Sequence, residues 1–140
     1  MSKANANLFA ALRQGFPADL QAVAVETDTG LLYTWQDLEE ATAMVANMLE
    51  SLSLPTGARI AAQVEKSVEA LVLYLATLRA GLVYLPLNTA YQKAEMEYFI
   101  NDAQPAVVVC TGRNFGWISK MAFLAGTAYV FTLNDDRTGS

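Results

Sequence analysis

The sequence predicts an α/β fold in which a mostly parallel sheet is flanked by helices, with a small helix and a β-hairpin ahead of it. From Arg59 onward, strand and helix patterns alternate as β-α-β-α-β-α-β. The strand segments are continuous apolar runs, which is typical of parallel strands buried on both faces. Because the elements alternate, we expect right-handed crossovers between the parallel strands.

A short amphipathic helix and a hairpin begin the chain. Residues 5–16 carry apolar side chains at helical spacing, and Pro17 ends that pattern. Val23–Glu26 and residues 31–33 are then predicted as two strands. The sequence Asp-Thr-Gly at residues 28–30 suits a tight reversal between them, so we expect a hairpin.

A strong helix pattern follows the hairpin. Thr34 stands where an N-cap residue is expected, and Asp37 is placed to favour the exposed N–H groups of the first turn. Pro55 and Gly57 end the pattern. The apolar residues are predicted to share one face, formed by Leu38, Ala41, Val45, Met48, Leu49 and Leu52.

The next helix is apolar nearly all round. Residues 59–64 form the strand before it, and Ser67 is a candidate N-cap for Val68–Arg79. A helix with this composition is expected to pack on a sheet and to be covered on its other side as well. Gly81 ends it.

The remaining elements continue the alternation. They are, in order, a strand at residues 83–87, a helix at 92–101, a strand at 106–110, a helix at 117–124 and a strand at Tyr129–Thr132. The helix at 92–101 carries Met96, Phe99 and Ile100 on its apolar side. Residues 134–140 are polar, and we interpret them as a loop or linker.

The composition is unusually apolar. Hydrophobic residues make up 54% and charged residues 16% of the 140 residues, against roughly 25% charged in ordinary domains. This deficit fits either a surface that other chain segments cover or a compact domain with a buried parallel sheet. Composition alone leaves both interpretations open.

Charge and patterning exclude several classes of protein. The net charge is −5, and the nine basic residues are scattered, which argues against nucleic-acid binding. The apolar run at residues 70–78 is too short for the roughly 20 residues that span a bilayer, and residues 1–10 show no signal-peptide pattern. A single cysteine, Cys110, excludes an internal disulfide. We therefore expect no membrane partner and a cytoplasmic location.

Ligands of open α/β sheets bind beyond the carboxyl ends of the strands. Four loops are candidates there: residues 65–67, 88–91, 111–113 and 134–136. None contains a glycine-rich phosphate-binding pattern, and Gly112 and Gly116 enclose only three residues. The absence of histidine removes Ser-His and Cys-His nucleophiles and leaves no plausible zinc site.

Three side chains near these loops have both a functional and a structural interpretation. Lys66 could neutralise a phosphate or carboxylate, but an ion pair with Glu65 or Glu69 is favoured. Tyr91 could offer a hydroxyl to a ligand, but packing against the following helix is favoured. Cys110 is interpreted as a buried small hydrophobe rather than a nucleophile.

A phosphoacceptor receiver domain has a similar length and alternation. It needs a cluster of carboxylates at the strand ends to hold Mg²⁺. The strand ends here supply only Glu65, and the opening helix and hairpin do not suit that fold. The receiver class is therefore rejected.

One segment, residues 63–110, carries a specific pattern: QVEKSVEALVLYLATLRAGLVYLPLNTAYQKAEMEYFINDAQPAVVVC. A helix rich in Ala and Leu ends at Ala80-Gly81, a strand with the sequence VYLPLN follows, and an acidic helix then leads to Asp-Ala-Gln-Pro at residues 102–105. Upstream, residues 33–38 read Tyr-Thr-Trp-Gln-Asp-Leu. These features resemble the N-terminal region of the adenylate-forming superfamily of acyl-CoA synthetases, peptide-synthetase adenylation domains and luciferases.

Within that superfamily, residues 65–71 and 87–91 most resemble malonyl-CoA synthetases. The resemblance covers residues 5–110 and weakens beyond Thr111. It implies that residues 1–140 are the N-terminal part of the large domain of a longer AMP-forming acid–thiol ligase. Such an enzyme uses Mg·ATP to convert a carboxylate to an acyl-adenylate and passes the acyl group to coenzyme A, as in fatty acid metabolism.

The family's phosphate loop, its aromatic-Gly-x-Thr-Glu segment, its ribose-binding Asp and its catalytic Lys are all missing from the chain. The resemblance therefore carries over no catalytic, cofactor-binding or metal-binding residue. We expect a scaffold that is inactive alone, with the remainder of the parent ligase as its partner and a small carboxylic acid as the parent's substrate. Uncovered apolar faces are expected to self-associate.

Two alternatives to the ligase fragment remain. The chain could be a free-standing, non-catalytic α/β binding or interaction module that keeps the family's fold. It could also bind ATP by itself, although the strand-end loops offer no suitable residues. Light scattering and Mg·ATP titration distinguish these alternatives from the fragment.

Overall fold

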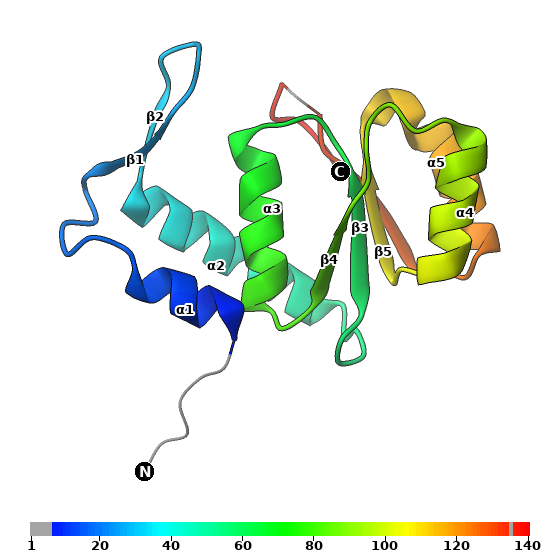
Figure 1. Ribbon diagram of the computed structural model, residues 1–140, viewed down its shortest axis with the longest axis horizontal. Helices are drawn as coiled ribbons and strands as arrows, with labels where there is room; N and C mark the ends of the chain where they lie inside the picture. The colour runs from blue at the N-terminus through cyan, green and yellow to red at the C-terminus, as the bar shows by residue number, and fades with distance from the viewer. Residues whose placement is uncertain (1–6, 135) are drawn as a thin grey trace. The chain divides into compact units, whose positions relative to one another are not determined.

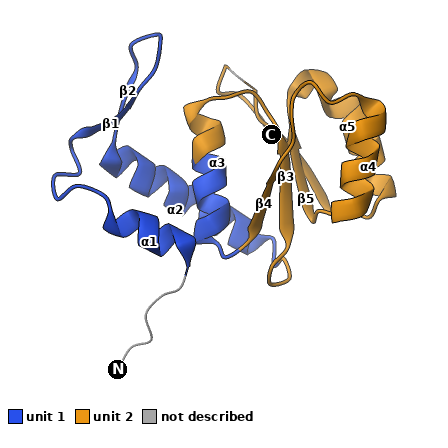
Figure 2. Ribbon diagram, viewed as in Figure 1, with its two compact units in different colours: residues 1–53, 72–81 blue, residues 54–71, 82–140 orange. Residues whose placement is uncertain are grey.

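The computed structural model describes residues 7–134 and 136–140. The chain divides into two compact units (Figure 2). Unit 1 comprises residues 1–53 and 72–81, and unit 2 comprises residues 54–71 and 82–140. The observed element order confirms the predicted α/β class, with a small helix and a hairpin ahead of the alternating strands and helices.

Unit 1 contains the opening helix, the hairpin and the longest helix (Figure 1). Helix α1 is Leu8–Gln14, and it begins where the Asn7 side chain accepts a hydrogen bond from the Phe9 N–H at 2.8 Å. Of the predicted helix at residues 5–16, Asn5 and Ala6 lie outside the described residues. The structure ends the helix at Gln14, three residues before Pro17.

The predicted hairpin is confirmed. Strands β1 (Val23–Glu26) and β2 (Leu32–Thr34) pair antiparallel, and Gly30 in the turn has a φ of 84°. Helix α2 (Trp35–Ser51) follows directly with the predicted cap at Thr34. The Thr34 N–H donates to the Asp37 carboxylate at 2.7 Å, and the Asp37 N–H donates to the Thr34 hydroxyl at 3.1 Å. Two exposed N–H groups are thereby satisfied by a reciprocal pair.

The buried face of α2 differs from the predicted one. Leu38 and Leu49 are buried as expected, but Met48 is 39% exposed. Thr42 is buried instead, because its hydroxyl donates to the Leu38 carbonyl at 2.7 Å and so loses no hydrogen bond on leaving water. The prediction counted only apolar residues and therefore chose Ala41 and Val45, whereas the buried positions are the next ones along the helix, Thr42 and Ala46.

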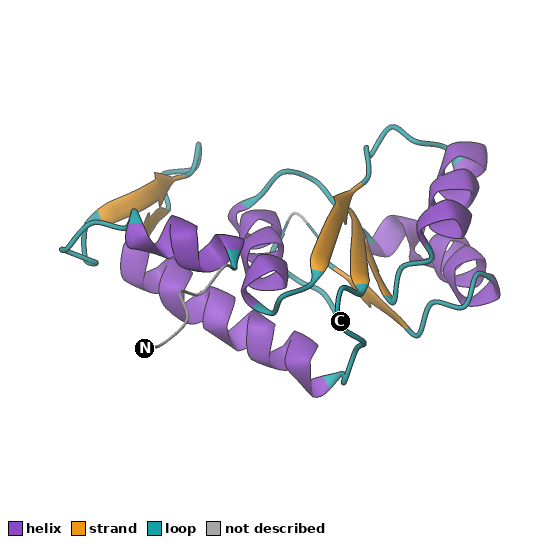
Figure 3. Ribbon diagram, turned by 60° about the horizontal axis from the view of Figure 1, so that its bottom comes forward, coloured by secondary structure: helices purple, strands orange, loops and turns teal. Residues whose placement is uncertain are grey.

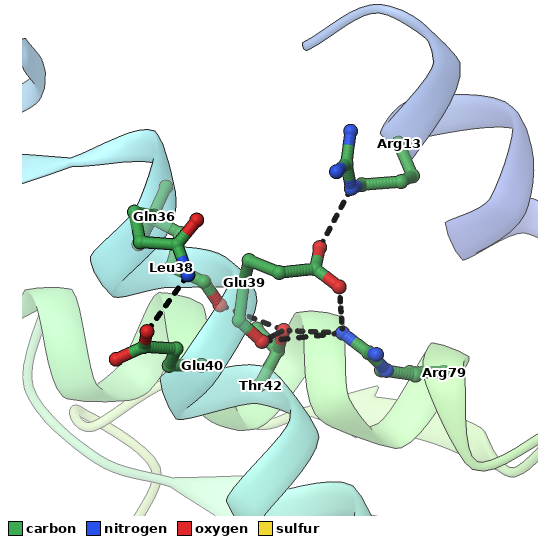
Figure 4. Close-up of polar contacts among 7 residues, drawn as sticks. All are labelled: Arg13, Gln36, Leu38, Glu39, Glu40, Thr42 and Arg79. Atoms are coloured by element: carbon green, nitrogen blue, oxygen red, sulfur yellow. Dashed lines mark hydrogen bonds and ion pairs between the residues drawn. The ribbon is translucent and has the colours of Figure 1, made fainter. Parts of the chain in front are cut away.

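A charged network joins the helices of unit 1 (Figure 4). The Glu39 carboxylate pairs with Arg13 of α1 at 2.7 Å and with Arg79 at 3.2 Å. Arg79 belongs to α3 (Val68–Arg79) and also donates to the Thr42 hydroxyl at 3.2 Å. Its guanidinium lies over the Phe9 ring at 4.9 Å. One carboxylate thus connects three helices.

Helix α3 has the predicted bounds. The Ser67 hydroxyl accepts a hydrogen bond from the Ala70 N–H at 3.0 Å, which confirms Ser67 as its cap. Gly81 follows with a φ of 74°, in the left-handed region that suits glycine at a helix end.

Unit 2 is built on a four-stranded sheet (Figure 3). The strands are β3 (Arg59–Gln63), β4 (Val83–Pro86), β5 (Val107–Cys110) and β6 (Tyr129–Thr132). They are arranged in the order β4-β3-β5-β6, and every neighbouring pair is parallel, as predicted. The two central strands, β3 and β5, are almost entirely buried.

Helices α4 (Lys93–Ala103) and α5 (Phe115–Leu124) lie side by side on one face of this sheet (Figures 1 and 3). A short 3₁₀ helix, η1 (Gly112–Asn114), leads into α5. The core under the two helices is formed by Ala61, Leu87, Met96, Ile100, Val108, Cys110, Ile118, Met121 and Ala122. Met96 and Ile100 are the predicted inner face of α4, and Phe99 packs partly buried against them.

The polar end of the chain, predicted as a loop or linker, forms backbone hydrogen bonds with the residues at the end of β6. Leu133 and Gly139 form an antiparallel bridge, and the Thr132 N–H donates to the Ser140 carbonyl at 2.7 Å. Arg137 adopts a left-handed φ of 71° in the turn and pairs with Glu69 at 3.1 Å. Residues 133, 134 and 136–140 therefore fold back beside the end of β6. Among the described residues, no helix is both long and apolar enough to span a bilayer.

Candidate functional site

The carboxyl ends of β3, β4 and β5 meet at one edge of the sheet of unit 2. The predicted loops gather there, and a groove of about 860 Å³ runs between them. It is lined by Glu65 and Lys66 after β3, by Asn88 and Thr89 after β4, and by Arg113 after β5. Because ligands of open α/β sheets bind at such an edge, this groove is the candidate site.

An ion pair crosses the groove. Arg113 and Glu65 lie 2.8 Å apart, with side chains 67% and 38% exposed. The predicted pairing of Lys66 with Glu65 or Glu69 is wrong, because arginines from distant loops take both carboxylates, Arg113 at Glu65 and Arg137 at Glu69. Within the described residues Lys66 forms no ion pair and stays exposed.

A buried glutamine, Gln63, holds the loop after β4. Its side-chain amide donates to the Asn88 carbonyl at 2.9 Å and to the Tyr91 carbonyl at 3.3 Å. Within the loop, the Ala90 N–H donates to the Asn88 side chain at 2.8 Å. Gln63 is 1% exposed, and its Oε1 has no partner among the described residues.

Gln63 was not among the site residues predicted from the sequence. The available signal was a polar residue at the end of an otherwise apolar strand, Arg59–Gln63. A buried amide in that position must find partners close by. The following loop supplies them.

Tyr91 packs against the helix that follows it, α4. Its ring stacks on Phe99 of α4 with centroids 5.1 Å apart and planes 23° apart. This confirms the interpretation that Tyr91 packs against the following helix.

The loop after β5 is tied to the end of the chain. The Gly112 N–H donates to Asn134 Oδ1 at 2.7 Å, and a Cβ added at Gly112 would lie only 3.1 Å from that oxygen. This N–H is therefore not available to a phosphate. Of the last candidate loop, Asp135 lies outside the described residues.

A smaller pocket of about 210 Å³ lies beside this contact, lined by Glu65, Thr111, Arg113, Asn134 and Asp136. The Thr111 hydroxyl is buried without a partner in the described chain. A hydrogen bond from the Thr138 hydroxyl, reinforced by the Thr138 N–H, lowers the pKa of the Asp136 carboxyl. The Asp136 carboxylate therefore stabilises the turn through its two hydrogen bonds with Thr138.

Cys110 is fully buried in the core of unit 2, and burial raises the pKa of its thiol to about 11. A thiol with this pKa is not a nucleophile at neutral pH. This confirms the interpretation of Cys110 as a buried hydrophobe. In the part of the chain that the structure describes, no three His, Cys, Asp or Glu side chains are grouped to hold a metal ion.

The strand-end residues do not fit the phosphates of ATP. Phosphate sites use glycine-rich loops with free N–H groups at a helix terminus. Here the Gly112 N–H is bonded to Asn134, and the loop after β4 is internally bonded. The groove is lined by loops held by hydrogen bonds within the chain, and the ion pair between Arg113 and Glu65 is exposed in it.

Comparisons with known proteins place this geometry in a family. A family model described as AMP-binding enzyme matches residues 11–134. Crystal structures of MatB from Rhodopseudomonas palustris, in apo and ATP-bound forms, share 49% sequence identity and superpose with a TM-score of 0.91. The match covers 98% of this chain and 27% of the MatB chain.

Curated relatives agree with this assignment. The medium-chain fatty-acid–CoA ligase of Escherichia coli is 34% identical over 82 residues, which are 59% of this chain and 14% of the ligase. Tyrocidine synthase 3 of Brevibacillus parabrevis is 32% identical over 76 residues, 54% of this chain and 1% of that protein. The chain thus spans a small part of the length of each relative. With its α/β fold and a family match over most of its length, the chain belongs to the AMP-binding enzyme family.

Proposed function

We propose that this chain is the N-terminal part of the large domain of an AMP-forming acyl-CoA synthetase, with malonate as the acid. The observation that carries the proposal is the 49% identity to MatB over 98% of the chain at a TM-score of 0.91. One of the matching MatB structures is bound to ATP. The resemblance at residues 65–71 and 87–91 supports the same acid.

The proposed reaction has two steps. The acid's carboxylate oxygen attacks the α-phosphorus of ATP and releases pyrophosphate, which gives an acyl-adenylate. The thiol of coenzyme A then attacks the acyl carbon and releases AMP, which gives the thioester. We assign the binding of ATP, Mg²⁺ and coenzyme A to the rest of the parent protein, because the strand-end loops here do not fit these groups.

The proposed role of residues 1–140 is to support the catalytic parts without supplying a catalytic residue. The support for this is the bonding of the loops. Gln63 fixes the loop after β4, and Asn134 fixes the loop after β5. Both loops therefore have a defined position before any ligand binds, as a scaffold requires.

We further propose a cytoplasmic location and a role in fatty acid metabolism. A single buried cysteine suits a reducing compartment, and acyl-CoA thioesters are metabolic intermediates. The E. coli relative is by name a fatty-acid–CoA ligase.

The test is thioester formation by the protein encoded by the complete reading frame that contains this segment. The purified protein is incubated with Mg·ATP, coenzyme A and either malonate, acetate or octanoate, and products are measured by mass spectrometry. Malonyl-CoA and AMP in equal amounts are expected. A product from octanoate alone would refute malonate but keep the family's reaction, whereas no thioester from any acid would refute the proposed activity.

A further inference from the structure

A second groove lies in unit 2, between helices α4 and α5 and away from the loops after β3. Its volume is about 520 Å³. Its lining includes Lys93 and Glu97 from α4 and Trp117, Lys120, Met121 and Leu124 from α5. Residues 117–124 span about 10 Å at 1.5 Å per residue. The groove is therefore about two helical turns long.

The floor of this groove is apolar and partly open to solvent. Met121 is buried and Trp117 is half-buried, whereas Leu124 is 90% exposed. The Trp117 indole N–H donates to Asn114 Oδ1 at 3.2 Å, which fixes the ring in its position. Side chains at positions i, i+4 and i+7 of α5 thus present a preformed apolar surface.

The rim of the groove carries positive charge. The chain has five arginines and four lysines, and four of the arginines are paired with carboxylates inside the fold. By contrast, Lys93 and Lys120 form no ion pair within the described ranges, and both are exposed. Glu97 is the only carboxylate among the lining residues, so the groove is positive by one charge although the chain is acidic overall.

We propose that this groove binds an acidic amphipathic helix of a partner protein. A helix laid between two others presents apolar side chains at i, i+3, i+4 and i+7, which matches the length and the apolar floor of this groove. Because Lys93 and Lys120 have no ion-pair partner among the described residues, they can pair with carboxylates of the partner. Charge complementarity therefore favours a partner helix with acidic residues beside its apolar face. The inference goes beyond the proposed ligase activity and does not depend on it.

The test uses the protein encoded by the complete reading frame that contains this segment and two fluorescein-labelled synthetic helical peptides. Both have leucines at i, i+3, i+4 and i+7; one has glutamates on the flanks of that face, and the other has lysines at the same positions. Fluorescence anisotropy gives the Kd of each. We expect the glutamate peptide to bind about tenfold more tightly, which corresponds to 1.4 kcal/mol, with the difference shrinking as salt is added.

Substitutions locate the binding. Leu124→Ala removes an exposed apolar side chain from the groove. It is expected to raise the Kd of the glutamate peptide by about tenfold. Lys93→Glu combined with Lys120→Glu is expected to reverse the preference, so that the lysine peptide binds more tightly. All three side chains are exposed, so these variants are expected to fold.

Two matched controls lie outside the groove. Met44→Ala removes an apolar side chain that is 72% exposed on α2, and Lys66→Glu reverses an exposed lysine after β3. Both are expected to bind the glutamate peptide as the unchanged chain does. The proposal is overturned if neither peptide binds, if the two bind equally, or if Met44→Ala weakens binding as much as Leu124→Ala.

Discussion

At the residue scale, the end of α4 holds a non-glycine residue in a conformation that favours glycine. Gln104 follows the helix with a φ of 46° and a ψ of 59°, and its N–H donates to the Ile100 carbonyl. The left-handed region costs an L-residue roughly 1–2 kcal/mol relative to glycine. Glycine, in turn, loses more entropy on folding.

Gln104→Gly is therefore expected to raise the free energy of unfolding of the chain by about 0.5–1 kcal/mol. Urea denaturation followed by circular dichroism measures it. The matched control is Asn101→Gly, an exposed position inside the same helix, which is expected to lower the free energy of unfolding by about 0.3 kcal/mol. A loss of stability in Gln104→Gly would show that its conformation is not strained.

The Cys110 thiol gives a second residue-scale prediction. Its pKa is raised from 9.0 to about 11 by burial, so the folded state favours the neutral thiol. The resulting stabilisation is complete below pH 9 and is lost as the pH rises through 11. We expect the free energy of unfolding to fall more steeply between pH 9 and 11 in the unchanged chain than in Cys110→Ala. Parallel slopes in urea titrations would contradict this.

Local capping could be predicted from the sequence, but long-range ion pairs could not. Thr34 and Ser67 were identified as caps because a cap and its partner lie within three residues of each other. The partner of Glu65 is Arg113, which lies 48 residues away. No local pattern brings these two side chains together, so Lys66 was chosen wrongly as the nearest cation.

At the scale of elements, Glu39 joins α1, α2 and the end of α3 within unit 1. Its carboxylate is 25% exposed, between two arginines that are 38% and 29% exposed. Isolated surface ion pairs contribute about 0–1 kcal/mol, and networks contribute more reliably than single pairs. Glu40, one residue on, is exposed, and among the described residues its side chain is bonded only to Gln36.

Glu39→Gln is expected to lower the free energy of unfolding by about 1 kcal/mol, because both ion pairs are lost while the shape is kept. Glu40→Gln is the matched control and is expected to change it by less than about 0.5 kcal/mol. Thermal and urea denaturation at low and high salt measure both. If the two variants are equally stable at low salt, the network does not hold the helices of unit 1 together.

The types and order of the helices and strands could be predicted from the sequence. The spacing of apolar residues and the glycines and prolines that end each element are local signals. All eleven predicted helices and strands occur in the expected order, and the 3₁₀ turn at Gly112–Asn114 is the one addition among the described residues. The buried face of α2 was predicted less well, since a back-bonded threonine can be buried as readily as an apolar residue. The return of residues 136–140 beside β6 depends on Arg137 adopting a positive φ, which no sequence pattern indicated.

At the scale of the whole molecule, family membership could be predicted and the catalytic site could not. The pattern at residues 63–110 resembles a superfamily, and the match to residues 11–134 confirms it. The chain covers 27% of MatB and 14% of the E. coli ligase. In the account proposed above, the groups that bind ATP and coenzyme A belong to the rest of the parent protein, so no residue pattern here can reveal them.

We propose above that these 140 residues support a ligase whose chemistry depends on the rest of the protein. Acid-dependent exchange of radiolabelled pyrophosphate into ATP tests it most directly, because exchange reports acyl-adenylate formation alone. The isolated 140-residue chain and the product of the complete reading frame are assayed side by side with malonate and Mg²⁺. We predict exchange by the complete protein and none by the isolated chain; exchange by the isolated chain, or none by either, would contradict the account.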